Sequence, residues 1–304
     1  MKTFHSADLL STPPAPIRYL VEGLLPLGGG GDTSGMPDSG KSTILLSMAS
    51  AISIGVPWYG LKTALTPAAW ITGEASGADA IQRDLHRLKI TESDILFFLP
   101  DDVLFRWESD QWITTSEGRA AIDRMRELQI GFVVLDTIGS LCAGLVEVDN
   151  DQQRQLARHL RAELHGLTYQ TISHTNQASA KDELSWRLHY LSRAGGNGFP
   201  GAQRWAAGVS RLRVEKPGRD TAIERNEGEA FGINASDVKG KKLIAFGVSK
   251  NNEAPAACWT NNHPAIFEVR RDGGLVLVKD GREPIVATAP GTLKRGAVNE
   301  DNDF

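Results

Sequence analysis

Short apolar runs alternate with amphipathic segments along the first two thirds of the chain. Four runs of mainly apolar residues predict strands, and the three longer segments between them have the apolar spacing that is typical of helices. This alternation predicts βαβ units and therefore a mostly parallel sheet. The predicted strands are 68–72, 95–99, 132–135 and 169–173, and the predicted helices are 76–89, 117–129 and 151–166.

The pattern changes after residue 175. The segment 175–203 is polar and carries the glycine-rich stretch 195–198 near its end, which predicts a long loop. Beyond this loop the apolar runs are separated by turn residues, and Asp272-Gly273-Gly274 is a hairpin signal. The strands predicted in this region are 207–214, 242–249, 266–270 and 275–278.

These patterns divide the chain into three parts. Residues 1–27 form an N-terminal arm with a Pro-rich piece, residues 28–279 form one α/β domain, and residues 280–304 lack periodicity and form a flexible acidic C-terminal tail. The tail ends Asn299-Glu300-Asp301-Asn302-Asp303-Phe304. Acidic residues that close on an aromatic ring resemble the partner-docking tails of replication proteins, although plain disorder is the alternative that we favour.

Composition excludes several classes of protein. The chain has 304 residues, of which 41% are hydrophobic, and no apolar run approaches the roughly 20 residues that a membrane span needs. Two cysteines, Cys142 and Cys258, have neither disulfide nor metal spacing, so we expect a protein of the reducing cytoplasm. The net charge of −4 does not indicate a surface coated in basic residues, but a ring with a basic channel is compatible with it.

The segment from Gly35 to Ser42 carries the strongest chemical signal, because it fits the phosphate-binding pattern G-x-x-x-x-G-K-[ST] in full. Glycines allow the backbone to wrap around a polyphosphate, and the next helix adds the positive end of its dipole. Lys41 would reach the β- and γ-phosphates of ATP, and the Ser42 hydroxyl would ligate Mg²⁺. The predicted nucleotide-binding residues are Gly35, Pro37, Asp38, Ser39, Gly40, Lys41, Ser42 and Thr43.

The residues before this motif do not have the apolar sequence that is expected there. A phosphate-binding loop normally follows a buried apolar strand, whereas residues 28–34 read Gly-Gly-Gly-Gly-Asp-Thr-Ser. The sequence therefore predicts a weak first strand or a distorted sheet at this place.

Other predicted strands end in residues that complete an ATPase site. Asp136 follows four apolar residues and would hold Mg²⁺ from the carboxyl end of its strand. Glu74 follows another strand and is the candidate base that polarises the attacking water. His174 ends a third strand, from which it would hydrogen-bond the γ-phosphate and report its loss to the adjacent loop.

These features together resemble the RecA-like ATPase superfamily, and more closely the RepA-type replicative helicases of plasmids and phages. The resemblance covers about residues 10–280. It rests on residues 35–42, Glu74, Val134-Leu135-Asp136-Thr137, Ile172-Ser173-His174, Gln203-Arg204-Trp205 and Phe246-Gly247-Val248-Ser249-Lys250-Asn251. It implies a RecA-like α/β core with a mostly parallel central sheet, C-terminal antiparallel strands and an N-terminal arm.

The resemblance also implies roles that spacing alone does not give. In such proteins ATP lies between the subunits of a ring, so Arg204 would be an arginine finger and Lys250 a second cation that acts on the neighbour's ATP. The expected assembly is a homo-oligomer, a hexameric ring around single-stranded DNA. Lys181, Arg187 and Arg193, in the loop that departs from the family pattern, are candidates for contacts to the DNA backbone.

Three functions remain open from the sequence. The first is an ATP-driven DNA helicase or translocase of plasmid or phage replication. The second is a RecA-like recombination or annealing ATPase that does not unwind DNA. The third is a nucleotide-gated regulatory or assembly module.

Overall fold

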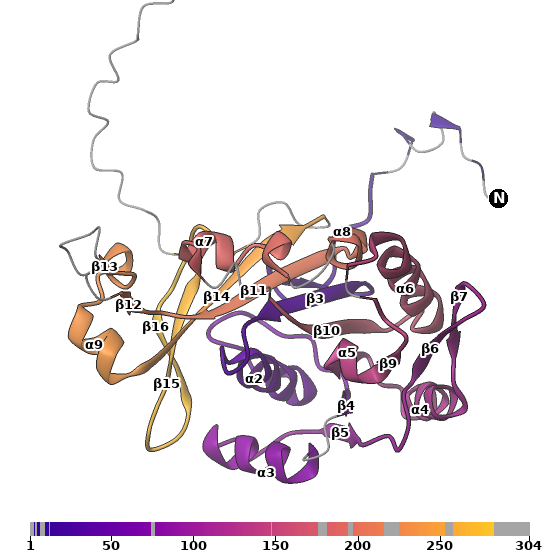
Figure 1. Cartoon of the computed structure of the whole chain (residues 1–304), viewed down its shortest axis with the longest axis horizontal. Coiled ribbons are helices and arrows are strands. Elements are labelled where there is room, and N and C mark those ends of the chain that lie inside the picture. The colour runs from indigo at the N-terminus through magenta and orange to yellow at the C-terminus, as the bar shows by residue number, and fades with distance from the viewer. Residues whose placement is uncertain are drawn as a thin grey trace, which may run out of the picture.

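A sheet of nine strands organises the protein (Figure 1). The computed structural model describes residues 3, 5–6, 10–11, 13–73, 77–146, 148–175, 181–193, 197–215, 225–252 and 258–282. From edge to edge the strands are β16 (Leu275–Lys279), β15 (Ala265–Val269), β14 (Lys242–Asn251), β11 (Trp205–Arg211), β3 (Gly30–Gly35), β10 (Thr168–His174), β8 (Phe132–Asp136), β4 (Ala68–Thr72) and β5 (Ile95–Phe98). The strands from β11 to β5 are parallel, and β14, β15 and β16 continue the sheet in antiparallel order. This architecture confirms the predicted mixed α/β fold with a RecA-like core.

Helices cover both faces of the sheet. The apolar helix α2 (Lys41–Ile54) and the amphipathic helix α3 (Gly77–Arg87) pack on one face, where they form a core with Phe132, Ile172 and Phe246. Helices α4 (Ser116–Glu127) and α6 (Asn150–Glu163) pack on the other face. The short helices are α5 (Ile138–Leu141), α7 (Leu184–Arg187), α8 (Gly198–Ala202) and α9 (Ala235–Gly240), with 3₁₀ turns η2 (Tyr190–Ser192) and η3 (Glu229–Phe231).

Three small sheets flank the large one. They pair β1 (Tyr19–Val21) with β2 (Leu25–Pro26), β12 (Val214–Glu215) with β13 (Arg225–Asn226), and β6 (Phe105–Glu108) with both β7 (Gln111–Thr114) and β9 (Cys142–Ala143). The hairpin of β1 and β2 buries Leu20, Val21, Leu24 and Leu25 in the core that also contains α2. Residues 19–26, which the sequence assigns to the arm, are therefore part of the folded domain.

Strand β3 lies at the centre of the sheet although its sequence is Gly-Gly-Asp-Thr-Ser-Gly, and all six of its residues are buried. Its glycines make room for large neighbours on β10. A Cβ atom at Gly30 would lie 2.1 Å from Tyr169 Cζ, and one at Gly31 would lie 2.1 Å from Gln170 Nε2. The predicted weakness of this strand reflects its own propensity, whereas pairing with β10 and β11 on either side determines its structure.

We expect Gly30→Ala to lower the free energy of unfolding by about 1–3 kcal/mol, because the new methyl group collides with the buried Tyr169 ring. Urea denaturation measures this loss, and Gly201→Ala, which meets no atom within 4 Å, is the matched control. The cost should shrink in a Tyr169→Leu background. An equal cost in both backgrounds would contradict Tyr169 as the source of the clash and leave the Gln203 side chain, which the new methyl group also meets.

None of the described helices is both long and apolar enough to cross a membrane.

Candidate active site

The phosphate-binding loop connects β3 to α2 at the carboxyl end of the sheet. Lys41 is buried, with 6% of its surface exposed, and its Nζ donates hydrogen bonds of 2.9 Å to the carbonyl oxygens of Gly35 and Met36. Gly40 has a φ of 98°, and a Cβ atom there would lie 2.3 Å from Ile244 Cδ1. The glycine of the motif is therefore required by both its backbone conformation and its neighbours.

The loop fits the phosphates of a nucleotide. Ser39 is buried, and its Oγ atom has no hydrogen-bond partner among the described residues. The Lys41 ammonium lies inside the same loop, whereas the carboxylate of Asp38 turns outward to Lys242, 2.7 Å away. This hydrogen bond lowers the pKa of Asp38, so the carboxylate stays ionised and paired outside the loop. A buried hydroxyl and a buried ammonium group inside one glycine-containing loop suit an anion.

Ser42 and Asp136 meet at the mouth of the loop. The Ser42 hydroxyl, in the first turn of α2, donates a 3.1 Å hydrogen bond to Asp136 Oδ2 at the end of β8. Both groups are oxygen ligands of the kind that Mg²⁺ prefers. The described residues contain no cluster of three or more His, Cys, Asp or Glu side chains that would hold a metal by themselves. The pair therefore fits a Mg²⁺ ion that also binds phosphate oxygens and water.

Of the two candidate residues His174 and Glu74, the structure describes only His174. His174 is exposed at the end of β10 and pairs in register with Gly35, so the strands place it beside the phosphate-binding loop. Glu74 lies outside the described residues. The preceding residue, Gly73, donates its N–H to the carbonyl oxygen of Asp136 at 3.3 Å. The end of β4 therefore lies beside the carboxyl end of β8.

Two basic residues lie near the loop that were not predicted from the sequence to be there. Arg87, in the last turn of α3, donates a 2.9 Å hydrogen bond to the Thr43 hydroxyl, and Lys242 starts β14 and pairs with Asp38. The antiparallel direction of β14 brings its first residue to the edge where the parallel strands end. A sequence argument that considered this direction would have found Lys242, but it would not have found Arg87.

Arg204 and Lys250 lie at the amino-terminal ends of the parallel strands, whereas the phosphate-binding loop lies at their carboxyl ends. The Arg204 N–H donates to the Gly30 carbonyl oxygen, five residues before the loop begins at Gly35, a separation of roughly 17 Å along a strand. Lys250 lies eight residues beyond Lys242 on β14. These residues span roughly 27 Å, and Lys242 is the one that lies beside the phosphate-binding loop. Neither cation is placed to act on a nucleotide in its own phosphate-binding loop.

The three basic residues predicted to contact DNA differ in their surroundings. Lys181 is exposed. Arg187 is buried and its Nη2 atom lies 2.6 Å from both carboxylate oxygens of Glu227. Arg193 is buried as well, with Nε 3.7 Å from the carboxylate of Asp32 in β3 and Nη1 3.2 Å from Gln153 Oε1. The burial and pairing of these two arginines contradict the prediction that they contact a DNA backbone.

Comparison with known families agrees with the geometry of the loop. A family model described as an AAA domain matches residues 2–180 of this chain. The chain belongs to this AAA domain family. The matched region of the AAA domain contains the phosphate-binding loop, Asp136 and His174, and it makes the chain a nucleotide-binding P-loop ATPase. Arg204 and Lys250 lie beyond it. No curated protein matches the chain.

Proposed function

We propose that this chain is an ATP-driven DNA translocase that forms a six-membered ring and unwinds DNA during plasmid or phage replication. The main support is the position of Arg204 and Lys250 at the sheet edge opposite to the phosphate-binding loop. A head-to-tail contact between identical copies brings opposite edges together, and such contacts close into rings. Each ATP site would then receive its cations from the next subunit.

The chemistry of this site is shared between two copies. Lys41 would hold the terminal phosphates, and Ser42 and Asp136 would hold the metal ion. Mg²⁺, when it is bound with ATP, neutralises part of the phosphate charge. Glu74 orients the attacking water, and Arg204 of the neighbouring copy stabilises the charge that develops on the transferred phosphoryl group. His174, next to the loop, links the presence of the γ-phosphate to the segment that follows β10.

Single-stranded DNA is the proposed cargo of the ring. Lys181, which is exposed after β10, is the candidate for a contact to the DNA backbone, because each neutralised phosphate adds to affinity independently of sequence. Arg187 and Arg193 are not part of this proposal.

Strand displacement on forked DNA tests the proposal. We expect the wild type to displace a strand when ATP and Mg²⁺ are present, whereas Lys41→Ala and Glu74→Gln should lower the rate at least about 100-fold. Lys62→Ala, at an exposed lysine, should leave the rate unchanged. ATP hydrolysis by the wild type without any displacement, or open filaments in place of closed rings in electron micrographs, would contradict the helicase function.

A further inference from the structure

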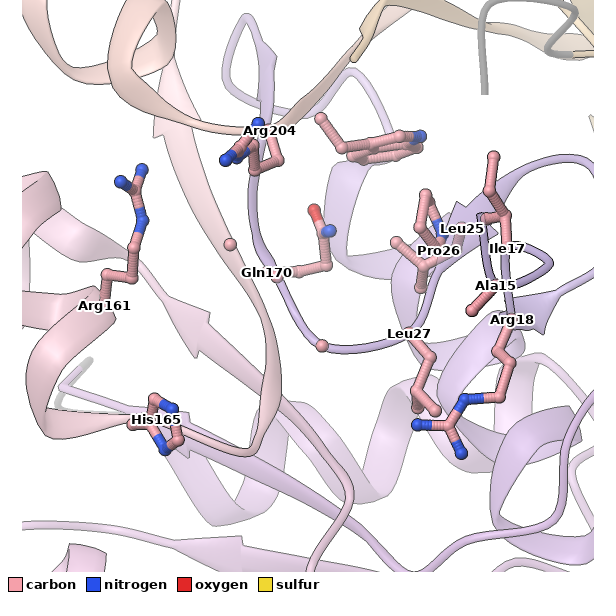
Figure 2. Close-up of a pocket in the computed structure, with 14 residues that line it drawn as sticks. Ala15, Ile17, Arg18, Leu25, Pro26, Leu27, Arg161, His165, Gln170 and Arg204 are labelled. Atoms are coloured by element: carbon pink, nitrogen blue, oxygen red, sulfur yellow. The ribbon is translucent and has the colours of Figure 1, made fainter. Parts of the chain in front are cut away.

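A basic pocket of about 440 Å³ lies at the amino-terminal edge of the sheet, opposite to the phosphate-binding loop. Figure 2 shows Arg161 and His165 on one side of it, Arg18 on the other, and Arg204 above Gln170 between them. These residues come from the N-terminal segment, from helix α6 and the turn after it, from β10, and from the residue that precedes β11. Among the described residues that line the pocket there is no Asp or Glu, so its charge suits an anion.

A buried donor at the base of the pocket lacks a partner. Gln170 is 1% exposed and its amide points between Arg204 and Pro26 (Figure 2). Its Oε1 atom accepts a 3.5 Å hydrogen bond from the Thr33 hydroxyl, but Nε2 has no partner among the described residues. An unsatisfied buried donor costs about 1–3 kcal/mol, and an occupant with a carbonyl or carboxylate oxygen would remove this cost.

The pocket also has apolar walls. Leu25 and Trp205 are buried beside it, whereas Ile17 and Leu27 leave 45% and 38% of their surfaces exposed. The combination of cations, an unpaired amide donor and apolar walls suits a peptide that carries both carboxylates and an aromatic ring.

The cations around the pocket repel one another. The pKa of Lys250 is lowered by burial first, and then by the charges of Arg204 and Arg161. A bound anion would relieve this repulsion.

We propose that the acidic segment 299–304 of this chain docks in the pocket. Glu300, Asp301 and Asp303 would face the arginines, a backbone carbonyl oxygen would accept from Gln170, and the Phe304 ring would pack against the exposed Leu27 wall. Residues 296–304 contain no Lys or Arg, so every charge in this segment is complementary to the pocket.

A series of contacts connects the end of the described chain to the wall of the pocket. The Arg282 guanidinium lies over the Trp259 ring, 5.4 Å from its centroid, and the neighbouring Cys258 N–H donates to the carbonyl oxygen of Gly23 at 3.2 Å. Gly23 lies in the turn before β2, whose first residue, Leu25, lines the pocket. Residues 283–298 can extend over roughly 50 Å, so the acidic segment reaches the pocket at a high effective concentration.

Docking would cover Arg204. The segment would then compete with a neighbouring subunit for the same guanidinium group and restrain ATP turnover until it is displaced. This consequence rests on the proposed function, whereas the docking itself depends only on the pocket and the acidic segment.

Photocrosslinking in the full chain tests the docking. We place p-benzoyl-phenylalanine at position 304 and map its crosslinks by mass spectrometry, and we expect them at residues 15–30 and at Trp205. Arg161→Glu, or replacement of Glu300, Asp301 and Asp303 by their amides, should lower the yield about tenfold, because charge-assisted contacts are lost. Arg154→Glu, on the same helix and also exposed, is the matched control that keeps the yield.

Crosslinks that scatter over the surface, or that persist after charge reversal at Arg161, would overturn the proposal. Crosslinks from single-stranded DNA to residues 15–30, without any from position 304, would assign the pocket to nucleic acid and overturn it as well. The amide-substituted chain should hydrolyse ATP faster than the wild type. A failure of the helicase function would leave the crosslinks in place, so the two proposals fail separately.

Discussion

An Arg204→Ala variant is expected to bind ATP almost normally and to hydrolyse it about 10³- to 10⁵-fold more slowly than the wild type. The reason is that Arg204 lies beside Gly30, at the end of the strands opposite to its own phosphate-binding loop, and is therefore too far away to act on a nucleotide in that loop. Removal of the guanidinium would withdraw charge from the transition state in the neighbouring site and leave ground-state binding intact.

Phosphate release at saturating ATP measures the loss in turnover, and titration with a fluorescent ATP analogue measures binding. Arg154→Ala is the control, because Arg154 is an exposed arginine that pairs with Asp151 on the same helix. A loss of less than about tenfold would correspond to less than about 1.4 kcal/mol of transition-state stabilisation, too little for an arginine finger.

An Arg193→Met variant is expected to lose about 3–5 kcal/mol of its free energy of unfolding, because it leaves the carboxylate of Asp32 buried without its cation. Asp32 is 2% exposed in the central strand and accepts hydrogen bonds from the hydroxyl groups of Thr171 (2.6 Å) and Ser173 (2.8 Å). Arg193 also lies 4.8 Å from the centroid of the Phe199 ring. The pair thus connects the segment after β10 to the strand that carries the phosphate-binding loop.

Urea denaturation of Arg193→Met beside Arg154→Met measures this loss. The double variant Asp32→Asn/Arg193→Met should lose less than the sum of the two single changes, because the two side chains interact directly. The contradicting result is an Arg193→Met variant that keeps its stability but binds single-stranded DNA more weakly and with a smaller salt dependence. That result would support the original prediction that Arg193 contacts the DNA backbone.

The apolar strands and the residues that follow them could be predicted from the sequence. Strand β4 has the predicted bounds, and β8 ends at Asp136, one residue beyond the predicted run. Such strands are buried on both faces by helices, so they need continuous apolar runs, and these runs are visible in a single sequence. The same logic placed Asp136 and His174 at the edge that carries Lys41.

The central strand and one hairpin could not be predicted in this way. Strand β3 owes its conformation to neighbours whose Tyr169 and Gln170 side chains lie more than a hundred residues away in the sequence. The hairpin of β6 and β7 turns through Ser109 and Asp110, with φ values of 49° and 60°, rather than through the glycine-containing turn that marks most hairpins.

The basic residues of the loop after β10 show a further limit. Composition identifies Arg187 and Arg193 as cations in a polar segment, but their carboxylate partners, Glu227 and Asp32, are distant in sequence. A charged residue in a polar segment is expected to be exposed to solvent. These two arginines are buried instead, because each pairs with a carboxylate that is distant in the sequence. The positions of Arg204 and Lys250 follow from the direction of their strands. Strand β11 starts where the antiparallel strand β14 ends, so the two residues lie together at the amino-terminal ends of the parallel strands.

Mixing two inactive variants tests the central claim, that each ATP site is completed by a second copy of the chain. Lys41→Ala retains Arg204 but lacks the phosphate-binding lysine, and Arg204→Ala retains Lys41 but lacks the finger. In randomly mixed rings about a quarter of the sites combine an intact Lys41 with an intact Arg204 from the next subunit, so we expect about a quarter of the wild-type ATP turnover. Turnover that stays at the low level of the separate variants would contradict a shared site.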